Sequence, residues 1–157
     1  MKYYVVDAFA EKVFEGNPAG VCVMDKPISD ELMLNIAIEN NLSETAYAIK
    51  DGDKYNLRWF TPGGEINLCG HATLATAFII MNYVDKELKT VKFQTLSGEL
   101  TVTKSGDIYE MDFPSIHLEE YSLTEQMIVA LGVTPKETYK SRDLVFILES
   151  EEELKNV

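Results

Sequence analysis

Short apolar segments separated by turn residues account for most of the chain. Segments rich in Val, Ile, Tyr and Thr predict β-strands, because these residues fit the pleated surface of a sheet. Asp51-Gly52-Asp53 and Ser105-Gly106-Asp107 each separate two such segments and predict hairpins. The predicted strands cover residues 2–9, 21–24, 45–50, 55–61, 90–96, 99–104, 108–113 and 144–148.

Two segments carry the start and stop signals of surface helices. A helix over residues 30–39 is predicted because Ser29 precedes it and acidic residues fill its first turn. A shorter helix is predicted over residues 124–131, where Gly132 ends it.

One further segment is apolar on every side. From Ala72 to Met81 the apolar residues do not form a single stripe, and a helix that is apolar all round is buried all round. A surrounding sheet can supply that environment, so the pattern predicts an α+β fold with mostly antiparallel strands wrapped around a buried central helix. Pro114 marks a boundary: residues 1–115 are predicted to form a first unit and residues 116–157 the beginning of a second.

The composition is that of a soluble globular protein. Apolar residues make up 46% and charged residues 25% of the sequence, which disfavours disorder. The longest uncharged stretch, residues 68–84, contains several polar residues and predicts a buried helix rather than a membrane span. The first residues lack the charged-then-apolar pattern of a secretion signal. We therefore expect a cytoplasmic protein that does not enter a membrane.

The charge balance restricts the partners. The 26 acidic and 14 basic residues give a net charge of −12, and repulsion of that size disfavours nucleic acid as a partner. A site for a small anion must then be built from local N–H groups or a few side chains. The two cysteines and two histidines are too few for a disulfide framework or a four-ligand zinc site, so we expect no metal site.

Four sites carry candidate chemistry, and each has a simpler structural explanation. Gly70 and His71 begin the buried helix, whose first N–H groups attract anions, but they could equally be a turn residue and a buried histidine. Glu44 lies where a helix ends and a strand begins, and partial desolvation there suits proton transfer; the alternative is an exposed strand-end glutamate. Cys69 could be a thiolate at a helix start or a buried apolar side chain. Asn17 could bind a substrate or simply occupy a turn.

Three motifs, taken together, are specific. Residues 7–9 with 14–21 (DAF and FEGNPAGV), residues 42–46 (LSETA), and residues 58–62 with 68–75 (RWFTP and LCGHATLA) resemble the phenazine-biosynthesis PhzF-like family. They occur in the family's order and span about the first 115 residues. The resemblance implies a diaminopimelate epimerase-like fold of two similar lobes, with a complete first lobe here and the start of the second.

The resemblance also implies a function. It implies an isomerase that moves protons on a small carboxylate-bearing substrate without metal or organic cofactor. Glu44 matches the family's proton shuttle, Gly70 and His71 line the substrate site, and Asn17 borders it. Cys69 occupies the place of one of two catalytic thiols in related epimerases and is a possible secondary acid/base. No partner cysteine is evident, so a two-thiol racemisation is unsupported.

Other readings of the sequence remain open. Family members are much longer, so we expect a truncated chain without turnover on its own. A non-catalytic binding or regulatory module that retains one lobe is the alternative. A cysteine-dependent redox or hydrolytic enzyme is disfavoured, because the side chains of Cys69 and His71 are expected to diverge at a helix start. The apolar strand over residues 144–148 lacks a predicted partner strand and predicts self-association, for example as a homodimer.

Overall fold

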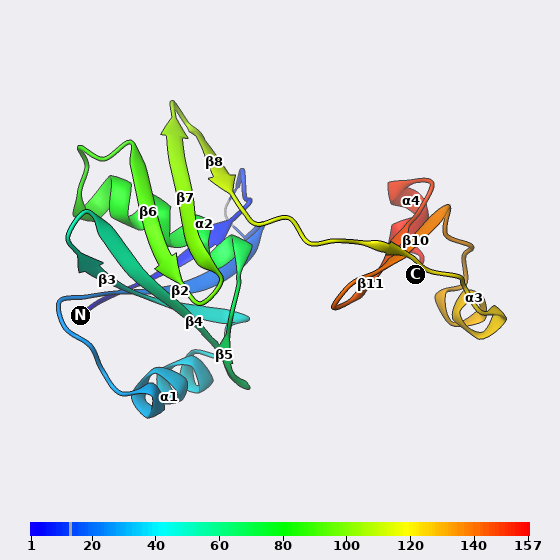
Figure 1. The fold of residues 1–157 in the computed structure, drawn as a ribbon, viewed down its shortest axis with the longest axis horizontal. Helices are drawn as coiled ribbons and strands as arrows, with labels where there is room; N and C mark the ends of the chain where they lie inside the picture. The colour runs from blue at the N-terminus through cyan, green and yellow to red at the C-terminus, as the bar shows by residue number, and fades with distance from the viewer. Residues whose placement is uncertain (13) are drawn as a thin grey trace. The chain divides into compact units, whose positions relative to one another are not determined.

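A curled β-sheet dominates the first part of the chain (Figure 1). The computed structural model describes residues 1–12 and 14–157, and the chain divides into two units, Met1–Phe113 and Pro114–Val157. In the described part of the first unit, eight strands form one sheet in the order β1-β2-β3-β4-β6-β7-β8, and β5 also pairs with β4. The strands are β1 Lys2–Ala8, β2 Asn17–Met24, β3 Glu44–Asp51, β4 Lys54–Thr61, β5 Gly64–Ile66, β6 Thr90–Thr95, β7 Gly98–Ser105 and β8 Ile108–Asp112.

Most neighbouring strands are antiparallel, as predicted. The exceptions are the β2–β3 and β4–β6 pairs, which are parallel. Both predicted hairpins are present: β3 and β4 pair around Gly52, and β7 and β8 pair around Gly106. Each of these glycines has a positive φ, of 61° and 63°, which is the backbone conformation that glycine adopts without steric cost.

The helix α2 (Gly70–Ile79) packs against the concave side of this sheet. Its buried residues join alternate residues of the strands in one core, because side chains on a strand point to alternate faces. The helix continues into a π-helical turn, η1 (Ile80–Val84), which ends where the N–H of Asp85 donates to the carbonyl of Ile80 at 2.7 Å. This core contains Ala19, Val21, Ala46, Ala48, Leu57, Trp59, Ala72, Ala75, Ile80, Phe93 and Leu100 among others.

The helix α1 (Asp30–Asn40) covers part of the opposite face of the sheet. Met33 and Ala37 pack with Cys22, Tyr47 and Phe60 in a second, smaller core. The hydroxyl of Tyr47 donates to the buried carbonyl of Met33 at 2.6 Å and fixes the helix to β3. One face of the sheet therefore packs against α2 and part of the other face packs against α1. Alternate residues of the central strands belong to one core or to the other.

The second unit, all of whose residues are described, is small. A three-stranded sheet in the order β11-β10-β9 combines with two short helices. The prediction that the apolar strand lacks a partner is wrong, because β11 pairs with β10 along its whole length. The sequence pattern does not indicate β10, because this four-residue strand carries a charged residue at each end. The elements are β9 Glu119–Glu120, α3 Glu125–Leu131, β10 Glu137–Lys140, β11 Leu144–Ile147 and α4 Glu151–Lys155.

The α+β prediction with a central buried helix is confirmed, with one local correction. The strand predicted over residues 21–24 is longer than expected, because β2 begins at Asn17. Pro18 fits there because it precedes the β3 ladder, which starts at Ala19, and proline is tolerated near the start of a strand. Across residues 1–12 and 14–157, no helix is long and apolar enough to cross a membrane.

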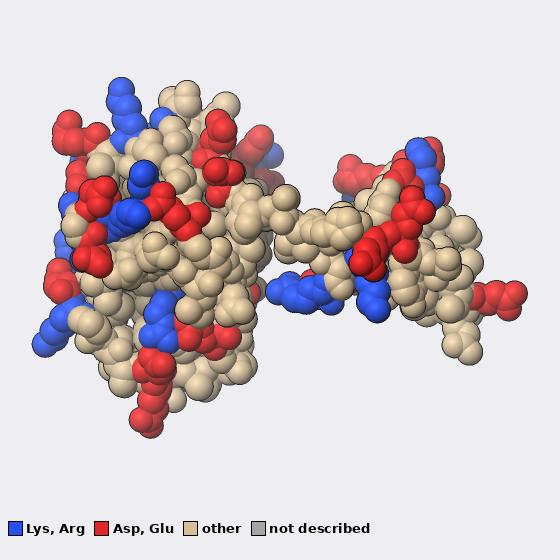
Figure 2. Space-filling view, in the orientation of Figure 1, with Lys and Arg blue, Asp and Glu red and all other residues tan. Residues whose placement is uncertain are grey.

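Charged side chains of both signs are interspersed on the face shown in Figure 2. Several basic side chains pair with acidic neighbours: Lys54 and Lys92 both contact Glu99, and Lys50 lies 3.2 Å from Asp85. The charges of these basic side chains are therefore partly compensated by neighbouring carboxylates. The net charge of −12 comes from the acidic residues in excess of the basic ones.

Candidate functional site

Glu44 is the first residue of β3 and faces α2. The β2–β3 ladder sets Glu44 opposite Ala19, and Ala19 belongs to the core that surrounds α2. Ala46, two residues further along β3, belongs to the same core, and residues two apart on a strand share a face. The side chain of Glu44 is 17% exposed, so the alternative of an exposed strand-end glutamate is wrong.

Cys69 and His71 stand at the start of α2. Cys69 is the N-cap residue with extended backbone angles (φ −147°, ψ 120°), and its side chain makes no capping hydrogen bond. The carbonyl of Cys69 accepts a 2.5 Å hydrogen bond from the hydroxyl of Thr73. The N-terminus of α2 thus presents N–H groups and the positive end of the helix dipole without a carboxylate or hydroxyl cap.

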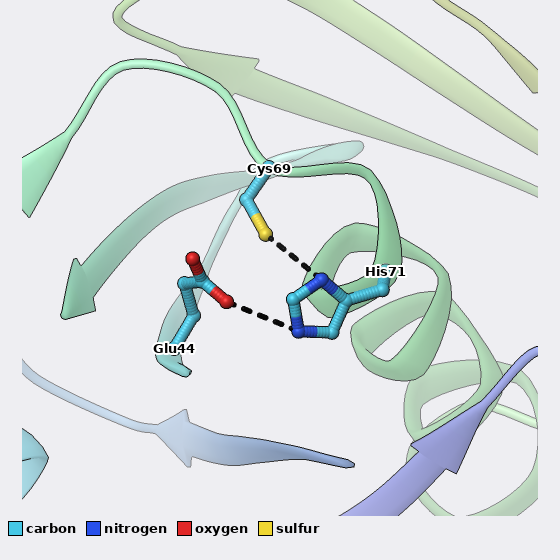
Figure 3. Close-up of side chains that lie close together, drawn as sticks. All are labelled: Glu44, Cys69 and His71. Atoms are coloured by element: carbon cyan, nitrogen blue, oxygen red, sulfur yellow. Dashed lines mark hydrogen bonds and ion pairs between the residues drawn. The ribbon is translucent and has the colours of Figure 1, made fainter. Parts of the chain in front are cut away.

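The imidazole of His71 lies between Glu44 and Cys69 (Figure 3). Its Nε2 is 3.1 Å from Oε2 of Glu44, and its Nδ1 is 3.5 Å from Sγ of Cys69. The Glu44–His71 pair is close but poorly aligned for a hydrogen bond, so both buried atoms lack a hydrogen-bond partner among the described residues. The contact becomes an ion pair when the imidazole is protonated.

The contact between Cys69 and His71 corrects the sequence-based expectation that their side chains diverge. That expectation assumed that both residues follow helical geometry. Cys69 is instead extended, outside the helix proper, so its side chain turns back over the first helical residues. The two groups meet at 3.5 Å.

Cys69 is held as a neutral thiol. Burial raises its pKa to about 11, and the nearby carboxylate of Glu44 adds to the rise. The backbone N–H groups of Ala72 and His71 oppose this rise without cancelling it. An accessible thiolate at this helix start is therefore disfavoured at neutral pH, which favours the reading of Cys69 as a packed thiol.

Gly70 has open space beside its Cα. Apart from its chain neighbours and the backbone of its own helix, a Cβ placed there would meet no heavy atom within 4 Å, and Gly70 is not among the positive-φ glycines. A tight turn is therefore not the reason for glycine at this position. The observation leaves room for a ligand to approach the backbone at the N-terminus of α2.

Asn17 lies on the same side of the sheet as Glu44. It is the first residue of β2 and pairs with Ala8 on β1. It precedes Ala19 by two residues, so it shares the α2-facing side with Ala19, and its side chain is half-buried. The structure thus brings Glu44, Cys69 and His71 into contact and places Asn17 and Gly70 on the adjoining surfaces.

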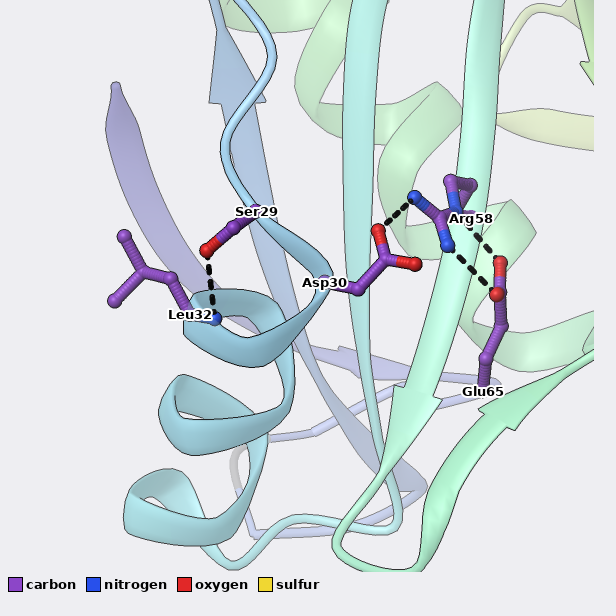
Figure 4. A network of polar contacts seen from close by, with 5 residues as sticks. All are labelled: Ser29, Asp30, Leu32, Arg58 and Glu65. Atoms are coloured by element: carbon purple, nitrogen blue, oxygen red, sulfur yellow. Dashed lines mark hydrogen bonds and ion pairs between the residues drawn. The ribbon is translucent and has the colours of Figure 1, made fainter.

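Arg58, the cation of the third motif, lies away from this group. It pairs in register with Tyr47, which faces α1. Its Nε and Nη2 donate to the carboxylate of Glu65 at 2.6 and 2.7 Å, and its Nη1 donates to Asp30 at 2.7 Å (Figure 4). Asp30 is the first residue of α1, and the hydroxyl of Ser29 caps this N-terminus by accepting a hydrogen bond from the N–H of Leu32. Arg58 therefore anchors α1 and β5 to β4, and it is already occupied by two carboxylates.

A separate hollow of about 580 Å³ lies in the second unit. It is lined mainly by polar residues, and the buried hydroxyl of Thr138 has no hydrogen-bond partner among the described residues. Its charged side chains, Glu120, Lys136 and Glu137, are exposed to solvent, whereas Glu44 and His71 are largely buried, so we assign the candidate site to the first unit. The hollow is lined by Glu120, Tyr121, Ser122, Lys136, Glu137, Thr138 and Tyr139.

Comparison with known proteins identifies the family. The family model described as phenazine biosynthesis-like protein matches residues 6–156. An uncharacterized isomerase of Pseudomonas aeruginosa is 46% identical over 149 residues, which are 94% of this chain and 57% of that protein. The human phenazine biosynthesis-like domain-containing protein is 37% identical, over 83% of this chain and 49% of its own length.

Solved structures agree with this assignment. A PhzF family protein of Enterococcus faecalis is 53% identical with a TM-score of 0.90, over 96% of this chain and 58% of that chain. A predicted epimerase of Pseudomonas aeruginosa, 18% identical, has a TM-score of 0.69 and shares the fold. The chain belongs to the PhzF-like family, and it spans between about half and three fifths of the length of these relatives.

Proposed function

We propose that the first unit supplies the acid/base group and the anion cradle of an isomerase that moves a proton on a small carboxylate-bearing substrate. The observation that carries this proposal is the contact of Glu44 with His71 at the uncapped N-terminus of α2. Curated relatives bear the name uncharacterized isomerase, which supports the reaction class.

The proton transfer follows from the chemistry of the three groups. The carboxylate of Glu44 takes a proton from a carbon next to a carbonyl or within a diene, and the C–H electron pair moves into the conjugated system. The developing negative charge is stabilised by the N–H groups at the start of α2, which also carries the positive end of the helix dipole. Glu44 then returns the proton to a different carbon or to the other face. The reaction is an isomerisation without net gain or loss of protons.

The proposed substrate is a small carboxylate, because the site can bind an anion locally. The net charge of −12 repels anions at long range. The uncapped N–H groups of α2 and the open space at Gly70 offer a short-range cradle. Asn17, on the adjoining strand, is proposed to hydrogen-bond the substrate from the side of β2.

Solvent deuterium tests the reaction class. The assay uses this chain alone and an extended protein, in which the chain is fused to the part of the Enterococcus faecalis relative that it does not match. Each is incubated in deuterated water with a panel of small unsaturated carboxylates and carboxylates with an acidic α-hydrogen. We expect deuterium to enter at least one substrate with the extended protein, and turnover to need the extension, because proton transfer requires an enclosed and oriented substrate.

The alternative, a non-catalytic binding module, gives a different result in the same panel. Calorimetric binding of a carboxylate without deuterium entry by either protein would favour that alternative. Deuterium entry by this chain alone would show that the first unit encloses the substrate without further residues. Absence of both binding and exchange across the panel would contradict the proposal.

A further inference from the structure

Glu44, Cys69 and His71 combine three kinds of metal ligand in one place. One ligand atom from each, a carboxylate oxygen, a thiol sulfur and an imidazole nitrogen, lie within 4.8 Å of one another. Counting only cysteines and histidines does not reveal this group, because its third ligand is a carboxylate. Glu44 reaches the helix start from a different strand, and sequence spacing does not reveal it.

Two of these groups are buried without a matched partner. Oε2 of Glu44 and Nε2 of His71 are shielded from solvent and lack a hydrogen-bond partner among the described residues. Burial of polar atoms without such partners is unfavourable, because each atom has lost its hydrogen bonds to water. A bound cation would satisfy both atoms, and the net charge of −12 favours the approach of cations.

The ligand types indicate which cation fits. Sulfur and imidazole ligands favour zinc-like ions, whereas magnesium and calcium prefer oxygen ligands. Ligand atoms around one tetrahedral zinc lie about 3.3–3.8 Å apart, as follows from metal–ligand bonds of about 2.0–2.3 Å. The observed separations of 3.1 Å and 3.5 Å involve opposite nitrogens of the ring. A rotation of the imidazole is therefore needed to present one nitrogen to an ion shared with the other two groups.

We propose that Glu44, Cys69 and His71 bind a zinc-like divalent cation with three protein ligands. When the Zn–S bond forms, the thiol proton of Cys69 is released to solvent. Three protein ligands leave the fourth tetrahedral position to water or to a carboxylate of the substrate. The cation therefore enters the site from the solvent side and competes there with the substrate.

Metal binding would regulate the activity. This consequence rests on the proposed function: a Glu44 carboxylate that coordinates zinc is not free to remove a proton from carbon. Zinc would then be an inhibitor that occupies the acid/base group, and a chelator would reverse the inhibition. The binding itself does not depend on the proposed function and can be measured on this chain alone.

Titration of the purified chain with ZnCl₂ by calorimetry tests the binding. We expect one saturable site that binds Zn²⁺ and discriminates against Mg²⁺. Cys69→Ser and His71→Gln should each weaken zinc binding at least roughly tenfold, or about 1.4 kcal/mol. The chain offers matched controls, because Cys22→Ala and His117→Gln remove the other cysteine and the other histidine. These two variants should bind zinc as the unaltered chain does.

Cobalt provides a second readout that needs no variant. Co²⁺ bound through Cys69 should give a thiolate-to-cobalt charge-transfer band, and the band should persist in Cys22→Ala. Circular dichroism checks that each variant is folded. Zinc binding that is equal in Cys69→Ser, that is matched by Mg²⁺, or that lacks the thiolate band with cobalt would overturn the proposal and assign the binding to surface carboxylates.

The two proposals can fail separately. Zinc binding with the thiolate band, but without deuterium exchange by the extended protein, would support the metal site and contradict the isomerase. Deuterium exchange that continues with zinc bound would support the metal site and remove its regulatory role. Exchange without any specific zinc binding would leave the isomerase and overturn the metal site.

Discussion

A Cβ at Gly16 would stand 2.4 Å from the carbonyl oxygen of Ala8. Gly16 also has a φ of +83°, which L-residues rarely adopt. The glycine that precedes β2 is therefore required by the backbone of the β1–β2 connection. Gly70 differs from Gly16 in both respects, because a Cβ there would have open space and its φ lies outside the positive range.

The two glycines should respond differently to the same substitution. Gly16→Ala should lower the free energy of unfolding by more than about 1 kcal/mol, because it adds a clash and a strained φ. Gly70→Ala should leave the stability within about 1 kcal/mol but weaken binding of the carboxylate substrate, because the methyl group occupies space proposed for the ligand. Urea denaturation and calorimetry measure the two effects. Normal substrate binding by Gly70→Ala would contradict the proposed cradle.

Alkaline pH should destabilise the fold through its two thiols. Burial raises the pKa of Cys22 and of Cys69 from an ordinary 9.0 to about 11. Between these values the unfolded chain has released protons that the folded chain still holds, so the free energy of unfolding falls as the pH rises from about 9 to about 11. The double variant Cys22→Ala/Cys69→Ala should lose this part of the decline. Urea denaturation below and within the interval measures it, and equal slopes for both proteins would refute the prediction.

Cys69 should contribute to packing more than to proton transfer. In the extended protein, Cys69→Ser should retain most of the exchange rate and lose about 1–3 kcal/mol of stability, because a hydroxyl is buried in place of a thiol. Alkylation of the thiol should be slow at neutral pH and accelerate only as the pH approaches the raised pKa. A rate loss of several orders of magnitude in Cys69→Ser would instead make Cys69 an acid/base group.

We still predict self-association, because the apolar strand β11 lies at an edge of its sheet. Within residues 114–157, β11 is an edge strand, and Leu144, Val145 and Ile147 are each between 36% and 40% exposed. An exposed apolar edge recruits a further strand, and a charge on it blocks such pairing. Val145→Lys should therefore reduce self-association in light scattering over a range of concentrations. Val129→Lys on α3 is the matched control and should not. A monomer at every concentration of the unaltered chain would disprove the prediction.

The sequence predicted the elements better than their contacts. The segment from Ala72 to Met81 is apolar on every side, and this predicted the central helix because such a helix needs burial all round. The Asp51-Gly52-Asp53 turn predicted a hairpin because glycine supplies the positive φ. Pattern and turn chemistry are local, so they can be read directly from the sequence.

The site could be predicted only as separate residues. Glu44 faces α2 because the parallel β2–β3 ladder sets it opposite Ala19, and β2 and β3 are buried on both faces, so no alternation reveals that register. The contact of Cys69 with His71 depends on the extended backbone of Cys69, which no residue pattern indicates. The resemblance to the family indicates the role of each residue, whereas the distances between their side chains follow only from the fold.

Glu44→Gln in the extended protein tests the account most directly. The amide keeps the shape of the carboxylate but cannot hold the proton, so the variant should fold and still bind the substrate in calorimetry. General acid–base catalysis contributes roughly 10²–10⁴-fold, and we predict that deuterium incorporation falls by at least about 10²-fold. Glu39→Gln, at an exposed position on α1, is the matched control and should exchange normally. Near-normal exchange by Glu44→Gln would contradict the assignment of Glu44 as the group that carries the proton.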